Sequence, residues 1–193
     1  MEKNRLEAFS DGVLAIIITI MVLELKVPPG SDLAALKPVV PVFLTYLLSF
    51  IYVGIYWNNH HHLLKAAHKV NGAMMWANLH LLFWLSLFPF VTGWMGANHF
   101  TPVPTALYGA VMLLAAIAYY ILQSVIVAEQ GRDSKLAVSI GRDFKGKLSS
   151  VLYAIAIAAS FFQPWIAGCV YVFVALIWLI PDRRIARVVD ESK

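Results

Sequence analysis

Charged side chains are scarce in this chain. Asp, Glu, Lys and Arg make up 13% of its 193 residues, whereas 60% of the residues are hydrophobic. A typical soluble domain carries about 25% charged residues, and its polar groups cover the surface that faces water. The composition therefore excludes an ordinary water-soluble domain and indicates a membrane protein.

Cysteine is nearly absent too, because Cys169 is the single one. One thiol can neither close an intrachain disulfide nor build a metal site. The sequence also lacks a nucleophile elbow, a P-loop and a dinucleotide-binding glycine motif. We therefore predict that the protein is not an enzyme and needs no cofactor.

Histidine occurs in the run His60-His61-His62, which raises the question of a metal site. Three consecutive side chains point in different directions on a helix, and no histidine pair here has the spacing that places two ligands beside a carboxylate. We therefore predict no metal site. A hydrogen-bond network at a helix end is the favoured role for these histidines, and titration with pH is the alternative.

Long apolar runs account for most of the chain. A membrane-spanning helix needs about 20 mostly apolar residues, and charge-poor runs predict six such helices, at about 5–25, 39–59, 73–97, 103–128, 148–162 and 164–181. The last two are short, and Gln163-Pro164 predicts a tight turn between them, although one long bent span is the alternative. Pro89 is expected to kink the third span. We expect an all-α integral membrane protein with a single domain, residues 1–193.

The positive charges are distributed unevenly between the two sides of the six-span arrangement. Thirteen of the 15 Lys and Arg residues fall on the side of the N-terminus, and only Lys26 and Lys37 fall on the other. Because cytoplasmic loops carry an excess of Lys and Arg, both termini are predicted to be cytoplasmic. The net charge of +4 therefore reflects topology, and no nucleic-acid partner is expected.

The first predicted helix has two distinct faces. At roughly 100° per residue, one narrow stripe contains Gly12, Ile16, Thr19, Ile20 and Leu23. Asp11 and Ser10 fall well away from that stripe. An acid within a span is costly and usually has a partner. The residues alone leave three roles open for Asp11: an N-terminal capping network with Ser10, a proton relay, or a substrate-binding acid.

The start of this helix resembles a known family. Arg5, Phe9-Ser10-Asp11, Ala15-Ile16 and Thr19 are similar to the R-x-x-x-F-S-D signature in the first helix of the transmembrane protein 175 family of potassium channels. Later elements of the chain resemble further motifs of that family: Trp57-Asn58-Asn59-His60-His61, Asn78-Leu79 and Pro89-Phe90. The resemblance covers about residues 5–180. The short chain looks like the prokaryotic branch, in which one six-helix unit is the whole subunit.

The resemblance implies a homotetramer in a prokaryotic plasma membrane, with the first helix of each subunit lining a pore for potassium and other monovalent cations. Ile16, Ile20 and Leu23 would form hydrophobic constrictions, Ile16 the narrowest, and Thr19 would add a ring of hydroxyls. Bulky apolar rings narrow and dewet a pore. The Thr-Val-Gly-Tyr-Gly filter of ordinary potassium channels is absent from the sequence.

The resemblance also implies a network that anchors the first helix within and between subunits. Its expected members are Arg5, Phe9, Ser10, Asp11, Trp57, His60, His61 and Asn78. In this interpretation Asp11 supports the pore without lining it.

Three other functions remain open on the residues alone: a small secondary transporter, a proton-permeable membrane protein and a membrane scaffold. A transporter would need a buried charge or broken helices near the midplane, whereas Asp11 lies near one end of its span.

Overall fold

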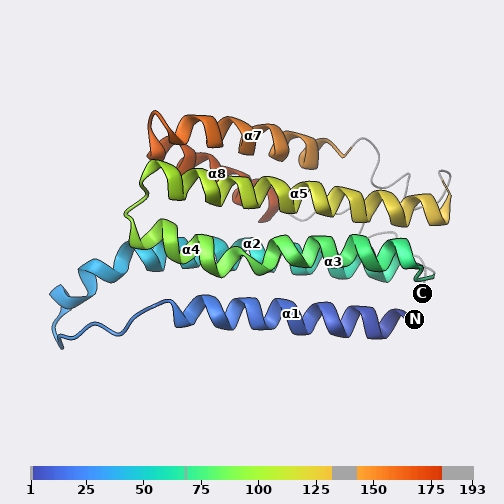
Figure 1. Ribbon diagram of the computed structural model, residues 1–193, viewed down its shortest axis with the longest axis horizontal. Coiled ribbons are helices and arrows are strands. Elements are labelled where there is room, and N and C mark those ends of the chain that lie inside the picture. Colours follow the sequence, from blue (N-terminus) through green and yellow to red (C-terminus); the bar gives the residue numbers. More distant parts are fainter. Residues whose placement is uncertain (1, 68, 132–142, 180–193) are drawn as a thin grey trace.

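The computed structural model describes residues 2–67, 69–131 and 143–179, and within them the chain is entirely helical or irregular, without a strand. Its helices lie side by side in an antiparallel bundle (Figure 1). The elements are α1 (Lys3–Leu23), the 3₁₀ helix η1 (Leu33–Val39), α2 (Val40–Ala66), α3 (Gly72–Ser86), α4 (Phe88–Ala97), α5 (Pro102–Gln130), α7 (Phe144–Ser160) and α8 (Pro164–Leu179). The prediction of an all-α fold is confirmed.

Prolines and polar caps set several helix boundaries. The third predicted span is broken at Leu87 into α3 and α4, and Pro89 lies in the first turn of α4, where its missing N–H costs no helical hydrogen bond. The tight turn at Gln163 is also confirmed, because α7 ends at Ser160 and Pro164 begins α8. Both predicted effects of proline are therefore present in the structure.

Helix α2 extends further than predicted. It continues through Ala66, so the histidine run lies inside the helix and not after it. Leu63 and Leu64 are fully buried in this last part. Their packing against the bundle continues the apolar face of the helix past the polar residues at which the expected span ended.

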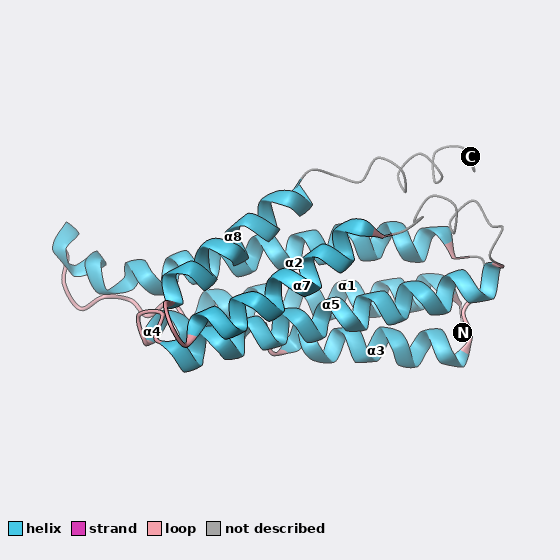
Figure 2. Cartoon of the chain, turned by 90° about the horizontal axis from the view of Figure 1, so that it is seen from above, coloured by secondary structure: helices cyan, strands magenta, loops and turns pink. Residues whose placement is uncertain are grey.

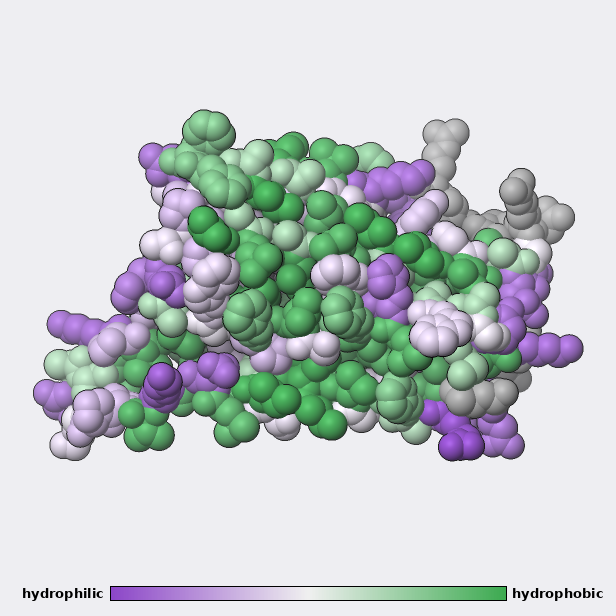
Figure 3. Space-filling view, viewed as in Figure 1, coloured by the Kyte–Doolittle hydropathy of each residue, from purple (hydrophilic) through white to green (hydrophobic). Residues whose placement is uncertain are grey.

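The helices differ in their ability to cross a membrane. Among the described residues, four segments are long and apolar enough: α1, η1 with α2, α3 with α4, and α5. Helices α7 and α8 have 17 and 16 residues, at or below the lower limit of about 17 residues for a span. The view in Figure 3 has hydrophobic side chains across the middle and most hydrophilic ones toward the ends. The protein is therefore an integral membrane protein, and six complete spans stay a prediction.

The bundle places α1 at one edge, where it packs against α2, α3 and α4. Figures 1 and 2 show that α8 runs back toward the end of the bundle at which α1 begins. This direction agrees with six helical passes among the described residues. The cytoplasmic position of that end stays a prediction.

Hydroxyl groups hold the interior of the bundle together. Ser49 of α2 lies within hydrogen-bond distance of Thr92 (2.6 Å) and Tyr108 (3.0 Å), and the Tyr171 hydroxyl donates to the carbonyl of Thr105 at 3.0 Å. All of these side chains are buried. Because a buried hydroxyl without a partner is costly, these contacts fix how α2, α4, α5 and α8 pack.

Candidate pore helix and its anchoring contacts

One face of α1 belongs to the core of the subunit. Its buried residues are Leu6, Ser10, Leu14, Ile17 and Met21, each no more than 3% exposed. Their spacing of three or four residues produces one continuous face of a helix. This face turns toward α2, α3 and α4 and leaves the opposite face of α1 without a covering helix among the described residues.

The predicted stripe lies on that uncovered face. Ile16, Ile20 and Leu23 are 58%, 43% and 78% exposed, and Gly12 and Thr19 are exposed with them. In a soluble protein such a row of apolar side chains would be costly to hydrate. In a membrane protein it faces lipid, another subunit or a pore.

Thr19 is the polar member of the stripe, and its hydroxyl has a defined orientation. The hydroxyl donates to the backbone carbonyl of Ile16 at 2.9 Å. A hydroxyl has one donor and two acceptor lone pairs, so the lone pairs of Thr19 remain available on the exposed face of α1. This arrangement presents a partial negative charge, which suits a cation.

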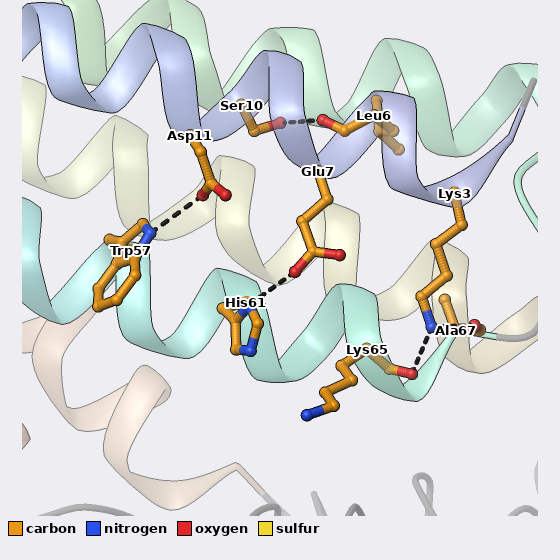
Figure 4. Close-up of polar contacts among 9 residues, drawn as sticks. All are labelled: Lys3, Leu6, Glu7, Ser10, Asp11, Trp57, His61, Lys65 and Ala67. Atoms are coloured by element: carbon orange, nitrogen blue, oxygen red, sulfur yellow. Dashed lines mark hydrogen bonds and ion pairs between the residues drawn. The ribbon is translucent and has the colours of Figure 1, made fainter.

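A row of contacts joins α1 to α2, as Figure 4 shows. The Trp57 indole N–H donates to Oδ1 of Asp11 at 3.0 Å. One helical turn away, Nδ1 of His61 lies 2.6 Å from Oε1 of Glu7. The rings of Trp57 and His61 stack on each other, with centroids 6.3 Å apart and planes inclined by 28°. Both acids of α1 therefore have a partner on α2.

The row continues for a third turn. The ammonium group of Lys3 donates to the carbonyls of Lys65, at 2.6 Å, and Ala67, at 3.1 Å. The contacts advance by four residues along α1 and retreat by four along α2, as expected for two antiparallel helices in register. We refer to this row as the outer ladder, formed by Lys3, Glu7 and Asp11 of α1 and by Trp57, His61 and Lys65 of α2.

A second set of contacts, the inner chain, lies in the core beneath the outer ladder. Nε2 of His60 is 2.6 Å from Oδ1 of Asn78, Nδ2 of Asn78 donates to the Ser10 hydroxyl at 2.9 Å, and that hydroxyl donates to the carbonyl of Leu6 at 2.8 Å. All three polar side chains are no more than 1% exposed. The inner chain therefore joins α2, α3 and α1 where no water can replace a lost partner.

The structure thus brings six predicted network residues together: Ser10, Asp11, Trp57, His60, His61 and Asn78. Arg5 and Phe9 do not join them within one subunit, because both residues are exposed and neither side chain has a hydrogen bond, ion pair or ring contact with a described residue. The capping role considered for Ser10 and Asp11 is wrong. Helix α1 already begins at Lys3, so both residues lie in its interior.

Sequence analysis missed Lys3 and Glu7, although a signal for them exists. Lys3, Glu7 and Asp11 follow one another at intervals of four residues, which places all three on one face of a helix. Trp57, His61 and Lys65 repeat the same spacing. The two rows could have been paired as antiparallel neighbours.

Comparison with known proteins agrees with this geometry. The model of the family described as endosomal/lysosomal potassium channel TMEM175 matches residues 5–89, which include most of α1, all of α2 and most of the anchoring contacts. A protein of Chryseobacterium sp. (strain P1-3) named a potassium channel is 59% identical over 192 residues, covering 100% of both chains. The chain belongs to the TMEM175 channel family. This confirms the family resemblance of the sequence.

Further TMEM175 relatives extend the comparison to structure. A protein of Chamaesiphon minutus named a potassium channel is 30% identical over 180 residues, 86% of this chain and 88% of its own. The crystal structure of a lysosomal potassium-selective channel TMEM175 homolog from Chamaesiphon minutus superimposes with a TM-score of 0.78 at 28% identity, covering 94% of this chain and 98% of that chain. The fold is therefore shared with a protein described as a potassium-selective channel.

The human relative differs in name and length. It is named an endosomal/lysosomal proton channel and is 41% identical over 86 residues, 38% of this chain but only 17% of the human protein. The family thus contains members named for two different cations.

Proposed function

We propose that this protein is a potassium-selective, leak-type cation channel whose pore is lined by α1 from four copies of the chain in a bacterial plasma membrane. The exposed stripe of α1 carries this proposal. The helix is held by its other face, so Ile16, Ile20 and Leu23 are presented outward at fixed positions. Four such helices around an axis would stack three apolar rings and one hydroxyl ring.

The apolar rings would control conduction. Narrow hydrophobic constrictions exclude ions by dewetting, and a slight widening lets water and a partly hydrated cation pass. Potassium gives up its hydration shell more easily than sodium, which favours potassium at such a constriction. The outward lone pairs of Thr19 would replace part of the lost shell. This mechanism needs no filter of backbone carbonyls.

The anchoring contacts would keep the rings in place. The outer ladder and the inner chain lie in the half of α1 that precedes the stripe, so they hold one end of the helix. Asp11, 3.0 Å from the Trp57 nitrogen, serves this frame and does not line the pore. Contacts of Arg5 and Phe9 with a neighbouring subunit belong to the same proposal.

Reversal potentials test the proposal. Purified protein in planar bilayers is placed between potassium and sodium solutions of equal concentration. We expect current without any other solute gradient and a reversal potential displaced toward that of potassium. Strict coupling of the flux to a second solute would identify a transporter instead. Absence of potassium and sodium current from oligomers that remain intact would exclude the proposed potassium channel.

A proton-permeable channel is the second candidate, favoured by the name of the human relative. Vesicles that contain the purified protein and are loaded with a pH-sensitive dye report proton entry driven by a potassium diffusion potential, which a potassium ionophore sets independently of the protein. We expect potassium permeation to exceed proton permeation. A proton flux that persists while potassium and sodium currents are absent would favour the second candidate.

A further inference from the structure

A cavity of about 420 Å³ lies between α2, α5, α7 and α8, away from α1. This volume falls in the range of about 300–1,000 Å³ that small-molecule sites occupy. Aromatic side chains form much of its wall: Tyr52, Tyr56, Tyr119, Tyr153 and Trp178. An apolar and aromatic lining suits a hydrocarbon chain.

The cavity opens at the outer surface of the bundle. Three of its lining residues are strongly exposed, namely Ile117 (40%), Tyr120 (50%) and Val151 (57%). They belong to α5 and α7, so the opening lies between these two helices. Since this surface is apolar and the protein is an integral membrane protein, the compounds that reach the opening are those dissolved in the bilayer.

Two opposite charges stand at one end of the cavity. Asp143 and Lys147 both line it, Asp143 as the residue that caps the start of α7 and Lys147 in the first turn of that helix. One carboxylate oxygen of Asp143 accepts the N–H of Gly146 at 3.2 Å, which leaves acceptor capacity on the other. The ammonium group of Lys147 makes no hydrogen bond or ion pair with any residue in the described part of the chain.

We propose that this cavity binds one phospholipid whose headgroup contains both a phosphate and a primary ammonium group, as in phosphatidylethanolamine. One acyl chain fills the aromatic cavity, Lys147 pairs with the phosphate, and Asp143 accepts hydrogen bonds from the ammonium group. A headgroup with only negative charge would bring its charge close to Asp143. A quaternary ammonium headgroup has no N–H to donate to it.

The cavity lies behind the helix that holds α1. Tyr52, Ile55, Tyr56 and Asn59 line it from α2, and this spacing forms one face of that helix. The outer ladder and the inner chain use Trp57, His60 and His61 of the same segment. A bound lipid therefore supports the α2 segment that anchors α1, and its effect on potassium flux rests on the proposed channel function.

Native mass spectrometry of the purified protein tests binding without reference to conduction. The protein is titrated in detergent with phosphatidylethanolamine, phosphatidylglycerol or phosphatidylcholine of identical acyl chains. We expect the first lipid to be retained most strongly. Lys147→Gln should weaken its retention about tenfold, which corresponds to about 1.4 kcal/mol. Lys65→Gln, at an exposed position outside the cavity, is the matched control.

A second pair of variants tests the acyl-chain part of the site. Ala116 lines the cavity, so Ala116→Phe should fill it and abolish retention, whereas Ala154→Phe on the exposed face of α7 should not. Equal retention of the three lipids, or equal effects of Lys147→Gln and Lys65→Gln, would overturn the proposal. If Lys147→Gln loses the lipid but potassium currents stay unchanged, the proposed lipid binding is supported and its proposed effect on the pore is overturned.

Discussion

Nε2 of His60 lies 2.6 Å from Oδ1 of Asn78, and this contact has a fixed direction. The Ser10 hydroxyl donates its hydrogen to the carbonyl of Leu6, so it must accept the hydrogen bond from the amide nitrogen of Asn78. The amide oxygen of Asn78 must then face His60, whose Nε2 carries the proton. These three contacts have one consistent order of donors and acceptors, whereas Nδ1 of His60 is buried without a hydrogen-bond partner in the described part of the chain.

Replacement of Asn78 by leucine should therefore destabilise the protein. Asn78→Leu keeps a similar volume but leaves the N–H of His60 without an acceptor in the core. An unpaired buried donor costs about 1–3 kcal/mol. Thermal unfolding in detergent measures the loss, with Asn58→Leu, an exposed position on α2, as the control. Equal melting temperatures for the two variants would show that the inner chain contributes no stability.

Asp11 should act on assembly more than on permeation. Asp11→Ala removes the acceptor of the Trp57 N–H, and we expect lower tetramer stability or expression. Asp11→Asn keeps an acceptor oxygen and should be milder. A double-mutant cycle with Trp57→Phe should give a coupling energy of about 0.6 kcal/mol, the average for such hydrogen bonds in a membrane protein, and no more than about 1.7 kcal/mol. A stable Asp11→Ala tetramer with altered ion selectivity would contradict the supporting role.

The side chain of Tyr171 packs directly against Gly109, which leaves no room for a larger residue at position 109. A Cβ atom at this position would overlap the Tyr171 hydroxyl, which donates to Thr105 in the core. Gly109→Ala should lower the free energy of unfolding by about 1–3 kcal/mol, as overpacking does, and adding Tyr171→Phe should recover part of it.

At Gly168 we expect the opposite effect of a glycine-to-alanine exchange on stability. A Cβ atom there meets nothing within 4 Å, so Gly168→Ala should stabilise α8 by up to about 1 kcal/mol through helix propensity. Equal melting temperatures for the two alanine variants would show that the space beside Tyr171 is not limiting.

Features of this structure that depend on local periodicity could be predicted from the sequence, whereas features that depend on packing between helices could not. Ile16 and Thr19 share an exposed face of α1 because a helix has a fixed period, which sequence alone reveals. The end of α2 at Ala66 depends on the burial of Leu63 and Leu64, and that burial comes from other helices. The cavity beside Lys147 arises where four helices fail to fill the space between them, so no local pattern marks it.

Thr19 provides a direct test of cation selectivity. Thr19→Val keeps the shape of the side chain but removes the oxygen whose lone pairs lie on the exposed face of α1. We expect a conducting channel whose reversal potential under potassium and sodium gradients moves toward zero. Thr19→Ser, which retains the hydroxyl, should stay close to the original protein. Undiminished selectivity in the valine variant would exclude a role for the hydroxyl ring.

Ile16 tests the assignment of the pore itself. Because its side chain lies on the exposed stripe of α1, Ile16→Asn should wet the apolar ring that we propose as the narrowest, increase single-channel conductance and weaken discrimination between potassium and sodium. Ile155→Asn makes the same exchange on α7 at a similarly exposed position, 54% against 58%, and should leave conduction unchanged. Both variants are recorded in bilayers as intact oligomers, so that loss of assembly is not mistaken for closure. If currents through the Ile16 variant equalled those of the original protein, α1 would not line the conduction pathway, and its exposed stripe would face lipid.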